Sequence, residues 1–294
     1  MATVEAGPLS SALRWILVCP LCKGALDVTA GVIACRTGHL RIEQTRPDCV
    51  DLLPREITGT DLGRWSERQV TMKEWYRDLL ATPADAAACF EQDYRVHSAV
   101  LRTLSGRVLD IGGGNGVARH YLGKGVQYIA LEPDLGWLDA PWADLADRFA
   151  CLASPPCFVR GIGEYMPFTD VSFDAALGFW SLNHAVDPPA VIAEAARILR
   201  PGGLLLLVLE DMPPSWVDLA RTGLLTSRPW RTARLVGHKL GSALLGRPWP
   251  LQPDHVRLIE VELRAWVEDR FEITARRWAN GYLTVEMRRR GNWP

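Results

Sequence analysis

The sequence has no long hydrophobic run and no export signal. Its longest unbroken apolar stretch is Leu204–Leu209, far short of the roughly 18 residues that span a bilayer. The N-terminus carries Glu5 and only a short apolar stretch at residues 15–18, which does not fit a signal peptide. Internal repeats and low-complexity segments are missing too. These absences exclude membrane-spanning, collagen-like and disordered proteins, and we expect a cytoplasmic location.

The chain also lacks an excess of charge of either sign. It has 33 Lys and Arg residues against 34 Asp and Glu residues, for a formal net charge of -1. This balance gives no overall attraction to nucleic acid or to anionic membranes. The length of 294 residues suffices for about two domains. Cysteine and tryptophan, by contrast, are abundant, with 7 and 12 residues respectively.

Four of the cysteines lie within the first 49 residues, in a pattern typical of a zinc ribbon. Cys19 and Cys22 form a CxxC pair, and Cys35 and His39 follow as CxxxH after twelve intervening residues. Three thiolates and an imidazole at this spacing suit a tetrahedral Zn²⁺ ion. Cys49 is the alternative fourth ligand, although its distance from Cys35 is unusual for a knuckle. A ribbon that has lost its metal and a redox CxxC are the other interpretations.

A site closed by four protein ligands is structural, because no coordination position stays open for chemistry. We therefore expect residues 1–55 to form a zinc ribbon whose folding free energy comes largely from the metal. Residues 56–104 have helical periodicity and are predicted to form a helical linker that caps an acceptor. Residues 105–294 alternate short apolar runs with helical patterns, which predicts an α/β domain with a parallel sheet.

A glycine-rich turn follows the first predicted strand of the α/β domain. Residues 107–116 read RVLDIGGGNG, with Asp110 at the end of the strand. The spacing lacks the third glycine of a dinucleotide fingerprint and the lysine of a phosphate-binding loop. An acidic strand end suits a ligand that carries a cationic amine. The next strand ends in Glu132, where a carboxylate accepts hydrogen bonds from ribose hydroxyls in doubly wound sheets; a surface glutamate is the alternative.

Five segments together resemble class I S-adenosylmethionine-dependent methyltransferases over about residues 105–290. They read VLDIGGGNG (108–116), ALEPD (130–134), GIGEYMPF (161–168), SFDAALGFWSLNHAVDP (172–188) and ILRPGGLLLLV (198–208). The resemblance implies a Rossmann-like, seven-stranded methyltransferase sheet that ends in a hairpin with its turn at 280–281. It also implies S-adenosylmethionine as cofactor.

The resemblance assigns cofactor-binding roles to eleven residues. These are Asp110, Gly112, Gly113, Gly114 and Gly116 for the methionine end, Glu132 and Pro133 for the ribose, Gly163 and Glu164 for the adenine, and Phe179 and Trp180 for the sulfonium. Ile162 stands where the family often has an aspartate that binds the adenine amino group. We therefore expect backbone groups to recognise the adenine.

The N-terminal ribbon has a resemblance of its own. Residues 19–54 are similar to the zinc ribbon of bacterial large-subunit rRNA guanine-N1 methyltransferases, and to small zinc-ribbon proteins that partner methyltransferases. This resemblance implies Cys19, Cys22, Cys35 and His39 as metal ligands. Residues 56–104 do not follow the rRNA enzymes.

His184 and His255 are the candidate catalytic bases. His184 follows the fourth predicted strand, and His255 begins a segment after a long insert at residues 212–253. The alternatives are a helix-entry residue bonded to backbone for His184 and a solvated helix start for His255. The sequence shows no catalytic triad spacing and no open metal site.

The insert contains a basic stretch. Residues 219–253 hold six Lys and Arg residues and no Asp or Glu, and their apolar residues are spaced as on an amphipathic helix. A solvated helical lid is one interpretation; a lid that binds an anionic acceptor, lipid or RNA phosphates is the other.

We favour a small-molecule acceptor, such as a biosynthetic intermediate or a sugar. The alternatives are an RNA guanine methyltransferase and a non-catalytic S-adenosylmethionine-binding partner protein. Four tryptophans are expected around the cofactor or acceptor, namely Trp65, Trp75, Trp180 and Trp230.

Overall fold

The computed structural model describes most of the chain. The described residues are 13, 15–29, 31–46, 48–54, 70, 74, 76–139, 142–225, 229–245, 247–252, 254–279 and 281–291, with no side chains for 222–225 and 229–232. Trp65, Trp75 and the side chain of Trp230 lie outside the described part, as does most of the predicted helical segment before residue 76. The predictions made for them therefore stay predictions.

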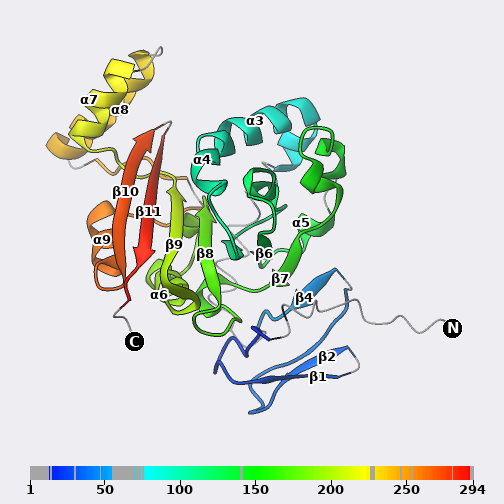
Figure 1. Cartoon of the computed structure of the whole chain (residues 1–294). Coiled ribbons are helices and arrows are strands. Elements are labelled where there is room, and N and C mark those ends of the chain that lie inside the picture. The colour runs from blue at the N-terminus through cyan, green and yellow to red at the C-terminus, as the bar shows by residue number, and fades with distance from the viewer. Residues whose placement is uncertain are drawn as a thin grey trace.

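A twisted sheet forms the centre of the molecule (Figure 1). In the described part of the chain its strand order is β10-β11-β9-β8-β5-β6-β7-β4. Strands β4 to β9 pair in parallel, and β11 is antiparallel to both β9 and β10. The strands are β4 (Cys49–Asp51), β5 (Arg107–Ile111), β6 (Gln127–Leu131), β7 (Cys157–Arg160), β8 (Phe173–Phe179), β9 (Leu199–Leu209), β10 (Phe271–Ala279) and β11 (Tyr282–Arg289).

This topology confirms the predicted Rossmann-like α/β class. Strands β5 to β11 are the predicted seven-stranded sheet with its closing hairpin, and β4 adds an eighth strand from the N-terminal segment. The chain runs from β5 outward through β6 and β7, and then returns to β8 on the other side of β5. Such a reversal leaves a crevice at the carboxyl ends of the two central strands, where ligands bind in open α/β sheets.

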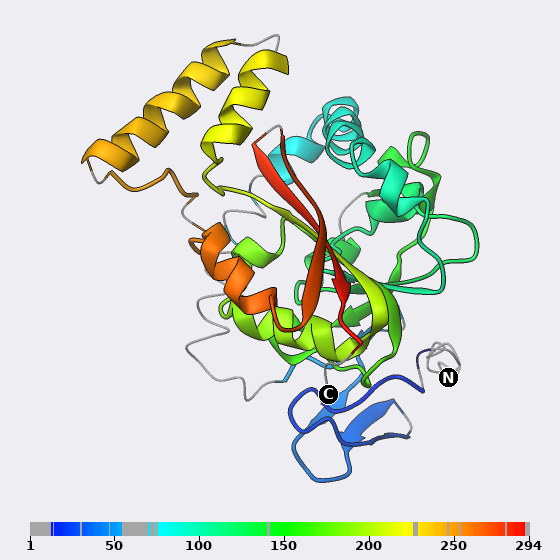
Figure 2. The same cartoon turned by 60° about the vertical axis from the view of Figure 1, so that its left-hand side comes forward.

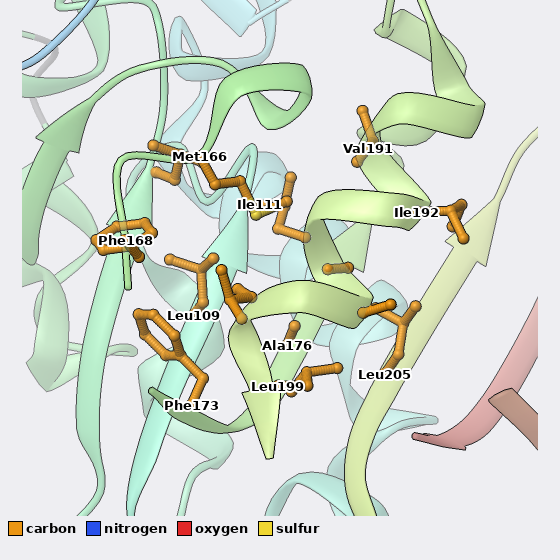
Figure 3. Close-up of a cluster of buried hydrophobic side chains, with 14 of the residues drawn as sticks. Leu109, Ile111, Met166, Phe168, Phe173, Ala176, Val191, Ile192, Leu199 and Leu205 are labelled. Carbon is orange, nitrogen blue, oxygen red and sulfur yellow. The ribbon is translucent and has the colours of Figure 1, made fainter. Parts of the chain in front are cut away.

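Helices cover both faces of the sheet because its parallel strands are apolar on both sides. On one face lie α6 (Pro188–Ile198) and α9 (Glu260–Val267), and on the other α3 (Pro83–Arg95), α4 (Ser98–Leu101) and α5 (Gly136–Asp139) (Figures 1 and 2). Helix α6 begins at Asp187, whose side chain accepts a hydrogen bond from the Ala190 N–H group, as an N-cap residue does. Figure 3 shows Val191 and Ile192 of α6 packing with strand residues such as Leu109 and Leu205.

Short 3-10 helices lie in several of the connections between strands. They are η1 (Val117–Tyr121), η2 (Trp142–Leu145), η3 (Ala150–Ala153), η4 (Gly163–Tyr165) and η5 (Leu182–His184). The segment directly after the glycine turn is the 3-10 helix η1. Two of these helices, η4 and η5, carry residues that the sequence places at the cofactor and acceptor.

The N-terminal module is a small antiparallel sheet of β1 (Leu26–Thr29), β2 (Val32–Cys35) and β3 (Arg41–Glu43). It is joined to the main domain by apolar packing, because Ile33 and Leu52 belong to the same buried cluster as the sheet core. An ion pair of 2.6 Å joins Lys23 to Glu194 of α6. Another of 2.9 Å joins Asp51 of β4 to Arg160 of β7.

The predicted insert contains a helical hairpin of α7 (Trp216–Leu225) and α8 (Pro229–Leu245). Both views show it extending away from the sheet (Figures 1 and 2). Leu244 and Leu245 near the end of α8 are exposed. No helix in the described part of the chain is long and apolar enough to cross a membrane.

Candidate active site

A cavity of about 490 Å³ lies at the carboxyl ends of the central strands. It brings together nine of the eleven predicted cofactor residues, namely Gly112, Gly113, Gly114, Glu132, Pro133, Gly163, Glu164, Phe179 and Trp180. The same cavity reaches both candidate bases, His184 and His255. A concave space of this size with a few converging polar groups is typical of a small-ligand site.

The glycine turn can line the cavity because it has no side chains in the way. Gly112 and Gly114 have φ values of 72° and 47°, a left-handed conformation that favours glycine. A Cβ added to Gly112 would lie 2.5 Å from the Ser181 Cβ atom, closer than side chains can pack. The Gly112 N–H group donates to the Leu131 carbonyl over 2.8 Å, which ties the turn to the end of β6.

Asp110 does not line the cavity but is buried under the turn, with 1% exposure. Its Oδ2 accepts a hydrogen bond of 2.6 Å from the Tyr128 hydroxyl, whereas its Oδ1 is buried and has no hydrogen-bond partner. Burial raises the pKa of Asp110 to about 7. An unpaired buried carboxylate oxygen is uncommon in a native fold, so this atom suits a ligand donor such as an ammonium group. Gly116 also lies off the cavity, at the start of η1.

Glu132 projects from the end of β6 and is 4% exposed. Its carboxylate accepts hydrogen bonds from the backbone N–H groups of Asp134, at 3.0 Å, and Gly114. Burial outweighs these bonds and raises the pKa of Glu132 to about 8. The Glu132 side chain thus links the glycine turn to the end of β6. Hydroxyl donors from a ligand would stabilise the ionised form of this carboxylate.

Glu164 of η4 lines the cavity and also binds the backbone ahead of α6. Its Oε1 accepts hydrogen bonds from the Val186 and Asp187 N–H groups over 2.8 and 3.2 Å. Burial raises the pKa of Glu164. Glu164 therefore fixes the start of α6 while it lines the cavity. Beside it, Ile162 packs with Leu53 of the N-terminal segment, which gives this end an apolar wall.

Aromatic side chains form the wall that adjoins the end of β8. The Trp180 ring centroid lies 5.3 Å from that of Tyr94 on α3 and 5.7 Å from that of Tyr282 on β11. Trp180 has a φ value of 54°, an uncommon conformation for a bulky residue that often occurs at functional sites. Tyr94 and Tyr282 were not predicted as site residues, because they lie on elements far apart in the sequence and carry no local motif.

The two candidate bases meet at the far end of the cavity. The rings of His184 and His255 are edge to face, with centroids 4.6 Å apart. His255 Nδ1 lies 2.9 Å from Asp211 Oδ2, and its Nε2 lies 3.5 Å from Glu210 Oε2. His184 Nδ1 lies 3.6 Å from Asp254 Oδ2. We call these five residues the histidine cluster.

Acidic groups dominate the electrostatics of this end. Asp93 of α3, Glu210 and Asp254 line the cavity, and no Lys or Arg does so among the residues that the structure describes. Burial, with repulsion from Asp211 and Asp93, raises the pKa of Glu210 to about 7. Burial lowers the pKa of His255, but the hydrogen bond with Asp211 and the charge of Glu210 outweigh it, so the net shift is upward.

The basic insert and the N-terminal module contribute little to the cavity. Of residues 212–253, only Gln252 is among the described residues that line it, and none of residues 13–54 does. None of the described side chains of α7 and α8 lines the cavity.

The predicted zinc ligands lie close together at the edge of the ribbon. The sulfur atoms of Cys19, Cys22 and Cys35 are all within 4.8 Å of one another. His39 Nδ1 lies 3.9 Å from Cys35 Sγ. Cys49, the alternative ligand, is buried in β4, where it pairs with Phe158 of β7. Three thiols and an imidazole are a donor set that fits Zn²⁺.

The central part of the chain is similar to known methyltransferases. A family described as "Methyltransferase domain" matches residues 109–207. A protein of Mycobacterium avium named an uncharacterized methyltransferase is 37% identical over 131 residues, which are 43% of this chain and 48% of that protein. A demethylmenaquinone methyltransferase of Paenarthrobacter aurescens is 28% identical over 187 residues, 61% of this chain and 68% of that protein.

Among solved structures, a SAM-dependent methyltransferase of Thermotoga maritima is 18% identical, with a TM-score of 0.46, and the match covers 77% of this chain and 99% of that one. The chain spans about half the length, or less, of the mycobacterial relatives that it matches. The residues that match the family, 109–207, include the glycine turn and the central parallel strands of the sheet. Residues 109–207 therefore match a methyltransferase domain, and they lie on a sheet of the Rossmann-like α/β class.

Proposed function

We propose that the protein transfers a methyl group from S-adenosylmethionine to a small-molecule acceptor bound in the same cavity. The observation that carries this proposal is that one cavity extends from the glycine turn to the histidine cluster. S-Adenosylmethionine supplies an electrophilic methyl group on its sulfonium. The protein must bind it, align the acceptor with it and exclude water.

Cofactor binding would use the chain's own groups as the sequence predicts. Asp110 and the glycine turn would hold the methionine end, and Glu132 would accept hydrogen bonds from the ribose hydroxyls. The orphaned Oδ1 of Asp110 and the glycine turn, which stays open to the cavity, support this assignment. Gly163, with Ile162 beside it, would bind the adenine through backbone and apolar contacts, and Phe179 and Trp180 would surround the sulfonium.

The acceptor would lie between the aromatic wall and the histidine cluster, which would assist the loss of its proton. Aromatic walls support an acceptor with an apolar or aromatic body. The name of the Paenarthrobacter relative, a demethylmenaquinone methyltransferase, agrees with such an acceptor. RNA is less favoured, because phosphate contacts need cationic side chains and the described cavity lining has none.

We also propose that the ribbon holds a structural Zn²⁺ ion through Cys19, Cys22, Cys35 and His39. The proximity of the three sulfur atoms and the imidazole supports this ligand set. The ion would hold the module rigid against β7 and α6 and would take no part in methyl transfer.

The direct test follows a radioactive methyl group from S-adenosylmethionine. The full-length protein is incubated with a small-molecule extract or with total RNA, and the label is separated by size. We expect the label in small molecules, and no loss when Arg221, Arg234 and Arg247 of the basic insert are replaced together by glutamine. Label in RNA, lost in that triple variant and at higher salt, would instead establish the RNA alternative. Cofactor binding without transfer to either pool would favour a non-catalytic partner protein.

Cofactor affinity should rise with pH between about 6 and 7.5. In the free protein burial raises the pKa of Glu132 to about 8 and of Asp110 to about 7, whereas bound hydroxyl and ammonium groups favour the ionised carboxylates. Binding therefore releases protons, and each proton changes affinity by up to about tenfold per pH unit. Calorimetry in buffers of different ionisation enthalpy measures this release. Affinity that stays constant over the window would contradict the assigned roles.

A further inference from the structure

The histidine cluster has the composition and spacing of a metal site. One potential ligand atom from each of His184, Asp254 and His255 lies within 4.8 Å of the other two. All three residues are buried and line the cavity. They come from separate segments, η5 after β8 and the stretch that follows the α7–α8 hairpin, and the fold brings them together.

A second observation points to a missing ligand at this place. Asp254 is 5% exposed, and its Oδ1 is buried without a hydrogen-bond partner. A buried carboxylate oxygen without a partner costs free energy that a bound cation would recover. Because Asp254 lines the cavity, a cation there would be accessible to a small molecule.

The neighbours of His255 match the surroundings of a metal-binding histidine. Its Nδ1 is 2.9 Å from Asp211 Oδ2, and Asp211 is itself held by the Gln252 N–H group at 2.8 Å. Histidine ligands commonly donate one ring N–H to a carboxylate, which leaves the other nitrogen free to bind the metal. That other nitrogen, Nε2, faces the cavity residue Glu210, whose Oε2 lies 3.5 Å away.

We propose that His184, Asp254 and His255 bind a divalent transition-metal ion at the acceptor end of the cavity, with Asp211 as a positioning residue. Two imidazoles and a carboxylate suit ions such as Zn²⁺, Mn²⁺, Fe²⁺ or Co²⁺, whereas Mg²⁺ and Ca²⁺ prefer sites made of oxygen alone. Unlike the four-ligand ribbon, three protein ligands leave coordination positions open.

The open positions define a class of acceptor. An acceptor that carries a hydroxyl, enol or carboxylate oxygen can complete the coordination, and the ion then fixes that oxygen in the cavity. This consequence rests on the proposed function, since it takes the histidine cluster as the acceptor end. Metal binding itself does not depend on it.

Titration with Co²⁺ tests the proposal, because cobalt distinguishes the two metal sites by colour. A thiolate site such as the ribbon gives a strong sulfur-to-cobalt absorption, whereas a site of nitrogen and oxygen ligands gives only weak ligand-field bands. The full-length protein should bind one equivalent of Co²⁺ that gives the weak ligand-field bands of a site made of nitrogen and oxygen ligands. Failure of the wild-type protein to show that equivalent would overturn the proposal without any variant.

Variants identify the ligands. Asp254→Asn and His255→Gln should each weaken the second cobalt site by more than roughly 100-fold, and Asp211→Asn by about 10- to 100-fold. His238→Gln on α8, a histidine outside the cavity, serves as the matched control and should change nothing. S-Adenosylhomocysteine binding reports whether each variant is folded. Undiminished cobalt binding in folded Asp254→Asn and His255→Gln proteins would refute the site.

The metal site and the proposed methyl transfer can each be refuted without the other. Methyl transfer that proceeds in protein lacking the second equivalent would leave the proposed function standing and remove the metal from the reaction. A cobalt site that depends on Asp254 and His255, in a protein that methylates nothing, would support the metal site and count against the proposed function.

Discussion

Replacing Glu132 by glutamine is expected to weaken S-adenosylmethionine binding by roughly 10- to 150-fold. This range corresponds to the loss of one charge-assisted hydrogen bond, worth about 1.5–3 kcal/mol, and loss of both ribose contacts would exceed it. Glutamine keeps the size of the side chain and an oxygen that can accept from the Gly114 and Asp134 N–H groups. The substitution also removes a carboxylate that burial disfavours, so the free protein should be no less stable.

Calorimetric titration at pH 8.5, where the wild-type carboxylate is largely ionised, measures the effect. The control is Glu262→Gln, an exposed glutamate of α9, which should bind the cofactor as tightly as the wild-type protein. Glu132→Gln protein should also release fewer protons on binding. A folded Glu132→Gln protein with unchanged affinity would show that Glu132 does not contact the ribose.

Replacing Cys35 by serine is expected to release the ribbon's metal and to lower the midpoint of thermal unfolding by roughly 10 °C. In small zinc domains the ion supplies about 10–16 kcal/mol of apparent binding free energy, and a loss of about 3 kcal/mol is enough for such a shift in a domain of this size. Cys35 is buried in β2 beside the other two thiols. The loss of stability should extend to the main domain, because Ile33 and Leu52 belong to the same hydrophobic core as the main sheet.

Metal analysis and a thermal scan, with and without a strong chelator, make the measurement. A chelator should lower the midpoint of the wild-type protein by more than that of the Cys35→Ser protein, because the variant has already lost the ion of the ribbon. Cys157→Ser, at the exposed start of β7, controls for the loss of a thiol outside the ribbon. If Cys35→Ser protein retains as much zinc as the wild-type protein, the proposed ligand set is wrong.

The pattern of residues along the chain was sufficient to predict much of the fold. Alternating apolar runs and helical segments predicted the α/β class, which the strand order confirms. The short strand β4 lies within the segment predicted as the ribbon, and its parallel pairing with β7 adds an eighth strand to the main sheet. Pairing of a three-residue strand depends on what lies beside it in space, so no local pattern predicts it.

The convergence of the predicted cofactor residues on one cavity was also predictable, because these residues belong to short motifs at strand ends. Parallel strands bring their carboxyl ends to one edge of a sheet, so Gly112, Glu132, Gly163 and Phe179 had to converge once the fold was known. The actual partners of Glu164 were not predictable, since the Val186 and Asp187 N–H groups reach it only through the packing of η4 against α6.

The class of the fold, the glycine turn and the residues expected around the cofactor follow from the sequence alone, because each depends on periodicity or on spacing within one segment. The proposed acceptor end, in contrast, forms only when the chain is folded. The tertiary structure placed Tyr94 and Tyr282 on one wall with Trp180, and it joined His184 to Asp254 and His255 across the insert. Those contacts arise from long-range packing of elements whose order in space the local pattern does not specify.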